Sequence, residues 1–425
     1  MALLVSMVLE GAGETDPLSI KDYESLGGFA ALRAAFALEP QAIIREITGA
    51  KLLGRGGAAY PAGKKWEQLL NIEGSPKYIV CNADEGEPGT FKDRRIMEAV
   101  PLRLLEGMII AGLTFNSPRG FIYVRGEYRR LQRRLAEAIQ ILRDAGYLGE
   151  RILGSPFSFE ITTISGAGAY VCGENSALLN SAEGLAGRPR IKPPHLAEVG
   201  LFLKPTLVNN VESFANIPLV LTMGGEKFLQ AGHPQSGGSK LVCLSGHVRA
   251  PGVYEVPLGG ATLRDIIFSP QLGDGIRDGR ELGFFHLGGQ SGPLGGPADL
   301  DVPYAYYPLR ERGLAVGSGA VVALDASVSP VEYLQKVAEF FSRESCGKCV
   351  PCREGNKILA KYLQKLQIPG AWTPEDERRL SDLMVAMRRA SFCGLGQSAT
   401  TALASAQKLF PGRFAGASAP AASEA

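Results

Sequence analysis

The chain has 425 residues, enough for two to four domains at the usual roughly 100–200 residues each, and its 45 Lys and Arg nearly balance its 43 Asp and Glu. This balance, without any long basic block, argues against nucleic acid as a partner. Seven cysteines are too few for a secreted disulfide scaffold and no apolar run approaches the ~20 residues of a membrane span, so we expect a cytoplasmic protein that meets a membrane only through partners.

The first predicted elements are helical. Residues 1–50 are predicted to form short-linked helices after a mildly apolar start, which lacks the basic stretch of a signal peptide. Strands then alternate with helices between residues 51 and 235. We expect the strands at 78–80, 121–128 and 157–165, and the helices at 101–113 and 129–147. This alternation predicts an α/β domain with a largely parallel sheet.

The second half of the chain changes character twice. Residues 236–325 combine two short strands around a Pro-Gly turn with a short helix from Thr262, which predicts a small β-rich unit. From Ser329 the apolar spacing is helical again, so residues 326–412 are predicted to form a helical domain. The remaining residues, 413–425, are small and of low complexity, and we expect a disordered tail.

Four cysteines form the clearest candidate site. Cys346, Cys349 and Cys352 stand at two-residue gaps, and Cys393, in the segment RRASFCGLG, follows Cys352 after 40 intervening residues. Three closely spaced thiolates and a remote fourth are typical ligands of an iron–sulfur cluster. Zinc is the alternative, although zinc sites more often combine two Cys-x2-Cys pairs. The other three cysteines are expected to be buried and unliganded: Cys81, Cys172 and Cys243.

Three loops predict a second site. The loop GRGGAAYPAGKKW, residues 54–66, combines glycines with basic residues and could cradle an anion, although a structural turn is an equal alternative. The loop after the strand at residue 80 is acidic and carries Asn82, Asp84, Glu85 and Glu87, while a second Gly-rich loop, residues 166–178, carries Tyr170 and Glu174. Ligands bind at the carboxyl ends of strands in α/β sheets, so together the loops predict a cofactor site.

In this order, the motifs resemble the flavin-bearing, NADH-oxidising subunit of bacterial complex I, the 51-kilodalton-like subunit. The same module occurs in NAD-linked hydrogenases and formate dehydrogenases. The resemblance covers about residues 20–412 and rests on the motifs GRGGAAYPAGKKW, CNADEGEPGTFKDR, YVRGEYRR, GAGAYVCGENSAL, KPTLVNNVES, SGHVRAPGVYEVP and SCGKCVPCREG.

The resemblance implies an architecture and three cofactors. It implies a Rossmann-like FMN domain, a ubiquitin-like β-grasp domain and a C-terminal helical bundle with a 4Fe-4S cluster on the four cysteines. NAD(H) is the implied substrate, with Glu87 as the carboxylate near the nicotinamide, and Lys192 and Tyr60 in the nucleotide pocket. The residues implied to bind FMN are Gly54, Arg55, Gly57, Lys65, Asn82, Asp84, Glu85, Tyr170, Gly173, Glu174, Asn209 and Asn210.

Four positions depart from the family pattern. Asn175 replaces a second glutamate, whose charge would repel the extra phosphate of NADPH. Its loss is expected either to relax discrimination between the two nucleotides or to change the flavin potential. Tyr60, Gln68 and His195 stand where the family has phenylalanines around the adenine. Tyr and His can still stack on a base, whereas Gln cannot. We therefore expect either altered nucleotide binding or ordinary family drift.

The predicted function is electron input. NADH would reduce FMN, and electrons would pass singly to the 4Fe-4S cluster and on to partner subunits, namely a small 24-kilodalton-like subunit with a two-iron cluster and a larger iron–sulfur subunit. One alternative is the same module as an electron relay that uses no NAD(H). Another is a non-enzymatic scaffold with structural zinc, which metal analysis would identify.

Overall fold

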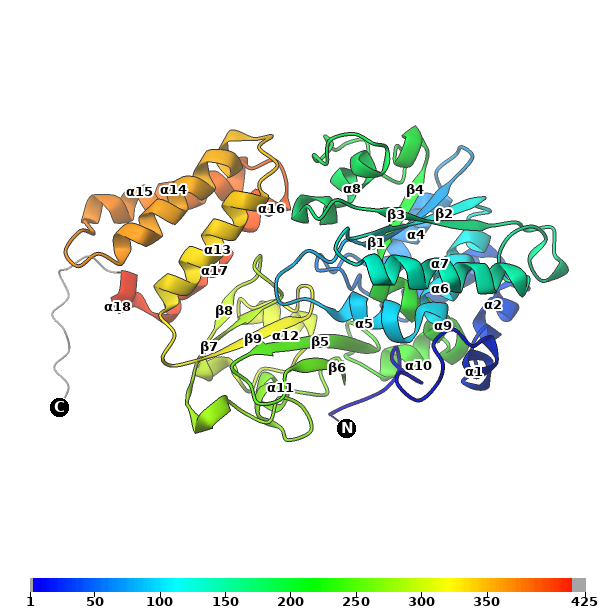
Figure 1. Ribbon diagram of the computed structural model, residues 1–425, viewed down its shortest axis with the longest axis horizontal. Helices are drawn as coiled ribbons and strands as arrows, with labels where there is room; N and C mark the ends of the chain where they lie inside the picture. Colours follow the sequence, from blue (N-terminus) through cyan, green and yellow to red (C-terminus); the bar gives the residue numbers. More distant parts are fainter. Residues whose placement is uncertain (1–2, 415–425) are drawn as a thin grey trace.

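The computed structural model describes residues 3–414, and its elements form three neighbouring units (Figure 1). The first unit is a parallel sheet with helices around it, the second is a mixed sheet, and the third is a group of helices. Within the described residues, no helix combines the length and the apolar character needed to cross a bilayer.

The first sheet has four parallel strands in the order β3-β2-β1-β4. The predicted strands and helices are present, although the second strand ends at Val124 and residues 125–128 form a turn. The bounds are β1 Tyr78–Ala83, β2 Arg119–Val124, β3 Glu160–Ser165, β4 Thr206–Asn210, α5 Lys92–Ala99, α6 Pro101–Thr114, α7 Arg129–Asp144, α8 Asn175–Ala182, α9 Val211–Met223 and α10 Gly225–Gln230. Helix α7 buries Leu131, Leu135 and Leu142 on one face, as their helical spacing predicts.

The N-terminal segment begins with turns, and its helices start only at Ile20. They are α1 Ile20–Ser25, α2 Ala30–Ala35, α3 Pro40–Gly49 and α4 Ala62–Leu70. The turns are anchored on the second unit, because the amides of Met7, Val8 and Leu9 donate to the carboxylate of Glu255 at 3.1, 2.8 and 3.0 Å. The start of the chain therefore joins two units.

The second unit confirms the β-rich prediction. Its sheet has five strands in the order β6-β5-β9-β7-β8, with β5 and β9 parallel and the other neighbours antiparallel. The Thr262 side chain caps the short helix as expected. The bounds are β5 Ser239–Gly246, β6 Gly252–Pro257, β7 Leu282–Leu287, β8 Leu294–Gly295, β9 Ala320–Asp325, α11 Leu263–Phe268 and α12 Tyr306–Glu311.

The third unit is helical, as predicted. Its elements are α13 Pro330–Glu344, α14 Val350–Leu366, α15 Pro374–Ala390, α16 Gly394–Ser398, α17 Thr401–Leu409 and α18 Pro411–Phe414. Ser329 caps α13, at the residue where the apolar spacing predicts that the helical pattern begins. The disordered tail expected over residues 413–425 is wrong for its first two residues, because residues 413–414 belong to α18 and Phe414 is buried. Residues 415–425 lie outside the described part of the chain.

Candidate functional site

The carboxyl ends of the parallel strands bring the predicted loops together. The side-chain amide of Asn82, on β1, donates to the carbonyl of Gly173 at 2.9 Å and to Oδ1 of Asn175 at 3.1 Å. The acidic loop and the second Gly-rich loop therefore meet at one edge of the sheet, where α/β proteins bind their ligands.

The first Gly-rich loop closes onto the same edge. A Cβ added at Gly56 would come within 3.0 Å of the Asn210 side chain. The absence of a side chain at Gly56 therefore lets the loop backbone pack closely against Asn210. The Arg55 side chain turns away from the loop, is fully buried and donates to the carbonyl of Gly237 at 2.8 Å. Any FMN contact at Arg55 stays a prediction, and the loop backbone would have to make it.

Two of the predicted site lysines, Lys65 and Lys192, lie near each other. The Lys65 ammonium is enclosed although the residue is partly exposed, and it donates to the carbonyl of Val208 at 3.0 Å. Burial, with the nearby charge of Lys192, lowers the pKa of Lys65 to about 8. Lys192 pairs with Glu174 at 2.7 Å, and the same carboxylate caps α8 through the amides of residues 176 and 177. An anion bound beside Lys65 would raise the pKa of Lys65 again and so favour its charged form.

Asp84 offers the best test of whether a ligand fits this edge. One of its carboxylate oxygens is buried and has no hydrogen-bond partner among the described residues. Burial raises the pKa of Asp84 to about 7, although the charge of Arg125 opposes the shift. An unpartnered buried oxygen is costly unless a ligand supplies a donor, so this edge fits a group with N–H donors such as a flavin ring.

The two asparagines at the end of β4, Asn209 and Asn210, are held by hydrogen bonds to other residues of the first unit. With its amide oriented to satisfy both partners, Asn209 accepts from Trp66 Nε1 at 3.0 Å and donates to the carbonyl of Val208 at 3.1 Å. Asn210 caps α9 through the amide of Glu212 and donates to Asp93 at 2.7 Å. Both side chains are therefore positioned by protein contacts, and their FMN contacts stay a prediction.

Glu85 has a structural partner set of its own. Its carboxylate accepts from the amides of Asp93 and Arg94 at 2.8 and 3.0 Å and from the Tyr128 hydroxyl at 3.1 Å. These contacts cap the start of α5 and join it to the turn before α7. Burial raises the pKa of Glu85 to about 7. A direct role for this side chain in cofactor binding stays a prediction.

Glu87 lies where the first two units meet. Its Oε1 accepts from the amide of Gln290 at 2.6 Å, and its Oε2 accepts from the hydroxyls of Tyr170 and Ser291 at 2.6 and 3.2 Å. The Tyr170 and Ser291 hydroxyls also lie 2.8 Å apart. Sequence reasoning did not find Gln290 and Ser291, although the run GGQSGPLGG around them is as rich in glycine as the loops of the predicted site.

The residues that depart from the family pattern lie at or near the surface. The Tyr60 hydroxyl donates to Gln68 Oε1 at 3.2 Å, and Tyr60 is 38% exposed, which leaves part of its ring accessible to a ligand. His195 is exposed, and its amide donates to Glu198 at 2.7 Å. Asn175 faces Asn82, as described above. None of these contacts excludes a nucleotide.

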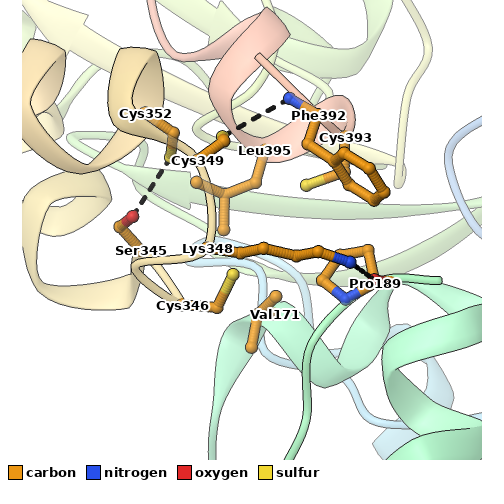
Figure 2. Close-up of a pocket in the computed structure, with 10 residues that line it drawn as sticks. All are labelled: Val171, Pro189, Ser345, Cys346, Lys348, Cys349, Cys352, Phe392, Cys393 and Leu395. Atoms are coloured by element: carbon orange, nitrogen blue, oxygen red, sulfur yellow. Dashed lines mark hydrogen bonds between the residues drawn. The ribbon is translucent and has the colours of Figure 1, made fainter. Parts of the chain in front are cut away.

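The four predicted cysteines line one pocket in the third unit (Figure 2). The pocket is also lined by Val171 and Pro189 from the first unit, and the Lys348 ammonium donates to the carbonyl of Pro189 at 2.5 Å. Among residues 3–414, no three His, Cys, Asp or Glu side chains are close enough to bind a single metal ion. Thiols spaced around a common hollow fit a cube of four irons, since each thiolate then binds a different iron.

The three remaining cysteines are buried, as predicted: Cys81, Cys172 and Cys243.

A short structural path joins the cysteine pocket to the strand edge. The Tyr170 amide donates to Glu344 at 3.0 Å, and the Tyr170 ring lies 5.0 Å from that of Phe340, centroid to centroid. Phe340 and Glu344 are on α13, which leads directly into Cys346. The same residue, Tyr170, therefore contacts Glu87 on one side and the support of the cysteines on the other.

Comparisons with known proteins agree with both sites. Residues 47–219 match the Nuo51 FMN-binding domain, and residues 332–416 match the NADH-ubiquinone oxidoreductase-F iron-sulfur binding region. One of the F subunits of NADH-quinone oxidoreductase in Rhizobium meliloti (strain 1021), the one numbered 2, is 40% identical over 96% of this chain and 96% of its own length.

Two relatives come from hydrogenases. The HndC subunit of an NADP-reducing hydrogenase, in Solidesulfovibrio fructosivorans, is 39% identical over 95% of this chain and 81% of its own length. The structure of an NAD+-reducing NiFe hydrogenase in the H2-reduced state superposes with a TM-score of 0.79 at 36% identity, over 89% of this chain. The chain spans only 62% of that hydrogenase chain.

The full-length match to an F subunit, with an FMN-binding region on the parallel sheet and an iron–sulfur region around the four cysteines, places this chain in the family of NADH-quinone oxidoreductase F subunits.

Proposed function

We propose that the chain is the electron-input subunit of a multi-subunit redox complex, in which NADH is oxidised at FMN and electrons leave through a 4Fe-4S cluster. When bound, FMN accepts a hydride and releases electrons singly, and the cluster carries one electron at a time. The observation that carries the proposal is the position of Tyr170, between Glu87 at the strand edge and α13 beside the cysteines.

The FMN site is assigned to the carboxyl edge of the first sheet. Asp84 has a buried oxygen without a partner among the described residues, and Lys65 is an enclosed cation suited to a phosphate. Glu87 would position the nicotinamide and needs no role as a base, since hydride transfer requires none. The remaining FMN contacts are assigned to Gly54, Arg55, Gly57, Asn82, Glu85, Tyr170, Gly173, Glu174, Asn209 and Asn210, and nucleotide contacts to Tyr60 and Lys192.

The cluster is assigned to Cys346, Cys349, Cys352 and Cys393. Their shared pocket and the family match over residues 332–416 support this assignment. Lys348 lines the same pocket and closes it against the first unit through the Pro189 carbonyl. The four cysteines would hold the cluster in this pocket, which Val171 and Pro189 of the first unit also line.

We assign the three units to domains and partners as follows. Residues 51–235 form the Rossmann-like FMN domain, 236–325 a ubiquitin-like β-grasp domain and 326–412 the helical iron–sulfur bundle. The partners are a small two-iron-cluster subunit and a larger iron–sulfur subunit, because single electrons leaving this chain need an acceptor. The similarity to NADH-quinone oxidoreductase and hydrogenase subunits supports a multi-subunit setting.

Anaerobic mixing of the isolated full chain with NADH tests the function. We expect prompt loss of flavin absorbance, followed by reduction of the cluster, since the nucleotide side of the site remains open around Tyr60. A parallel mixing with NADPH measures how strictly the site discriminates. Absence of bleaching with both nucleotides would contradict the proposal and favour a relay that uses no NAD(H).

A further inference from the structure

The loop between β7 and β8, residues 288–292, reaches from the second unit into the Glu87 site. Its Gln290 amide and Ser291 hydroxyl donate to the two different oxygens of Glu87, at 2.6 and 3.2 Å. Ser291 also lies within 2.8 Å of the Tyr170 hydroxyl, which donates to Glu87 in turn. The side chains of Glu87, Tyr170 and Ser291 are therefore in mutual contact, and their two hydroxyl protons can serve two of these three contacts at a time while Glu87 is ionised.

The loop is held at its other end as well. The Ser318 hydroxyl donates to the carbonyl of Gly288 at 3.1 Å and lies 2.5 Å from the hydroxyl of Thr90. Thr90 closes a turn with Glu87, since its amide donates to the Glu87 carbonyl at 3.0 Å. Both ends of the turn Glu87–Thr90 are thus hydrogen-bonded to loops of the second unit.

Glycine is required where the loop passes Glu87. Gly289 has φ +93°, and a Cβ added there would come within 2.2 Å of the Glu87 side chain. The backbone conformation and the close approach both disfavour larger residues. The loop and the carboxylate are therefore packed as one unit.

We propose that the loop 288–292 is a positioning element of the NADH-oxidising site and that Ser291 holds the Glu87 carboxylate in its working orientation. This inference rests on the proposed function. It adds a contribution from the second unit to a site that the motifs assign to the first unit alone.

Two competing effects act on the buried carboxyl group of Glu87. Burial raises the pKa of Glu87, whereas the donors Tyr170, Gln290 and Ser291 lower it. Removing one donor therefore raises the pKa of Glu87 and leaves its carboxyl group less constrained. As the pH falls, the variant would lose the carboxylate form at a higher pH than the wild-type chain does.

Ser291→Ala tests the inference. We expect KM for NADH to rise roughly tenfold, as for loss of one hydrogen bond to a charged group, with a smaller effect on kcat. The acid limb of the kcat/KM profile should move to higher pH. Ser291→Thr, which keeps the hydroxyl, should restore both. Ser291→Ala should also bind NAD+ more weakly at equilibrium. Calorimetry measures this binding without any turnover of the enzyme.

A glycine pair supplies a matched test of the loop. Gly289→Ala would push against Glu87, whereas Gly313→Ala, at φ +74° in open space, introduces similar backbone strain away from the site. We expect weaker NAD+ binding only in the first variant, with the FMN content of both unchanged.

The results of these experiments distinguish the positioning role of the loop 288–292 from the proposed NADH oxidation. If NADH bleaches the wild-type flavin but Ser291→Ala keeps the wild-type KM, pH profile and NAD+ affinity, the positioning role is wrong and the proposed function stands. If Gly289→Ala and Gly313→Ala behave alike, the loop has no specific role. A wild-type chain that neither binds NAD+ nor is bleached would overturn both proposals.

Discussion

Burial shifts the pKa values of Asp84 and Lys65, two of the residues proposed to bind FMN, in opposite directions. It raises the pKa of Asp84 to about 7 and lowers that of Lys65 to about 8, so each group is moved toward its neutral form. A ligand that offers a donor to Asp84 and an anion to Lys65 would reverse both effects. These two residues therefore select for a ligand with that pair of features.

Lys65→Met is expected to weaken FMN binding roughly tenfold at pH 7, because a charge-assisted contact to the phosphate is lost. In the wild-type chain, affinity should fall as pH rises above about 8, where free Lys65 loses its proton and binding must restore it. The variant should lack this decline. Quenching of flavin fluorescence measures the FMN affinity and its dependence on pH. The control is Lys64→Met, which removes the charge of the exposed neighbouring lysine. If Lys64→Met bound FMN as weakly as Lys65→Met, a specific role for Lys65 would be contradicted.

Side-chain direction marks the limit of residue-level prediction. Polar residues after a buried strand collect at the sheet edge, which predicts a site position for Asn82, and its side chain does join two loops there. Arg55 and Glu85 belong to the predicted loops as well but turn inward, Arg55 toward Gly237 and Glu85 onto the start of α5. Motif spacing identifies the loop, while packing against distant segments decides where each side chain points.

At the scale of elements, local patterns sufficed for most of the fold. Apolar spacing located α7, and the N-cap residues Thr262 and Ser329 marked the starts of α11 and α13. The contact between the loop 288–292 and Glu87 escaped prediction because it joins residues 203 positions apart. Such a contact depends on how two sheets are placed relative to each other, which periodicity does not describe.

Cys393→Ser is predicted to deplete the cluster, because Cys393, just before α16, is the one ligand that lies outside the Cys346–Cys352 segment. Iron and acid-labile sulfide should fall well below those of the wild-type chain, while FMN is retained by the separate first unit. Cys243→Ser, at a buried cysteine outside the pocket, should leave the iron content unchanged. Unchanged iron in Cys393→Ser would show that this ligand assignment is wrong.

At the scale of the whole molecule, a buried charge cluster joins the first two units. Glu212 on α9 accepts from Lys240 on β5 at 2.6 Å, and Lys92 on α5 lies 3.0 Å from the same oxygen. The amide of Leu241 donates to the other oxygen at 3.0 Å. All three charged side chains are almost fully buried. Without Glu212, Lys92 would keep Asp93 at 2.7 Å, whereas Lys240 would lose its carboxylate partner.

Glu212→Gln should therefore lower the free energy of unfolding by about 3–5 kcal/mol. The loss should appear as a lower melting temperature shared by both units, since Glu212 fastens one to the other. Asp301→Asn removes an ion pair with Arg264 at a site where the Asp301 side chain is 75% exposed, and it should leave the melting temperature nearly unchanged. Equal effects of the two substitutions would show that the buried cluster contributes little.

Glu344 would couple the assembly of the two proposed centres. It stands two residues before Cys346, and its carboxylate accepts from the amide of Tyr170 in the second Gly-rich loop. Iron insertion would fix Cys346 and so restrict Glu344, and with it the loop on the flavin side. Binding of the first cofactor would then already order part of the loop. The second cofactor would bind to a partly ordered site and lose less conformational entropy. Assembly would become positively cooperative although the two cofactors never touch.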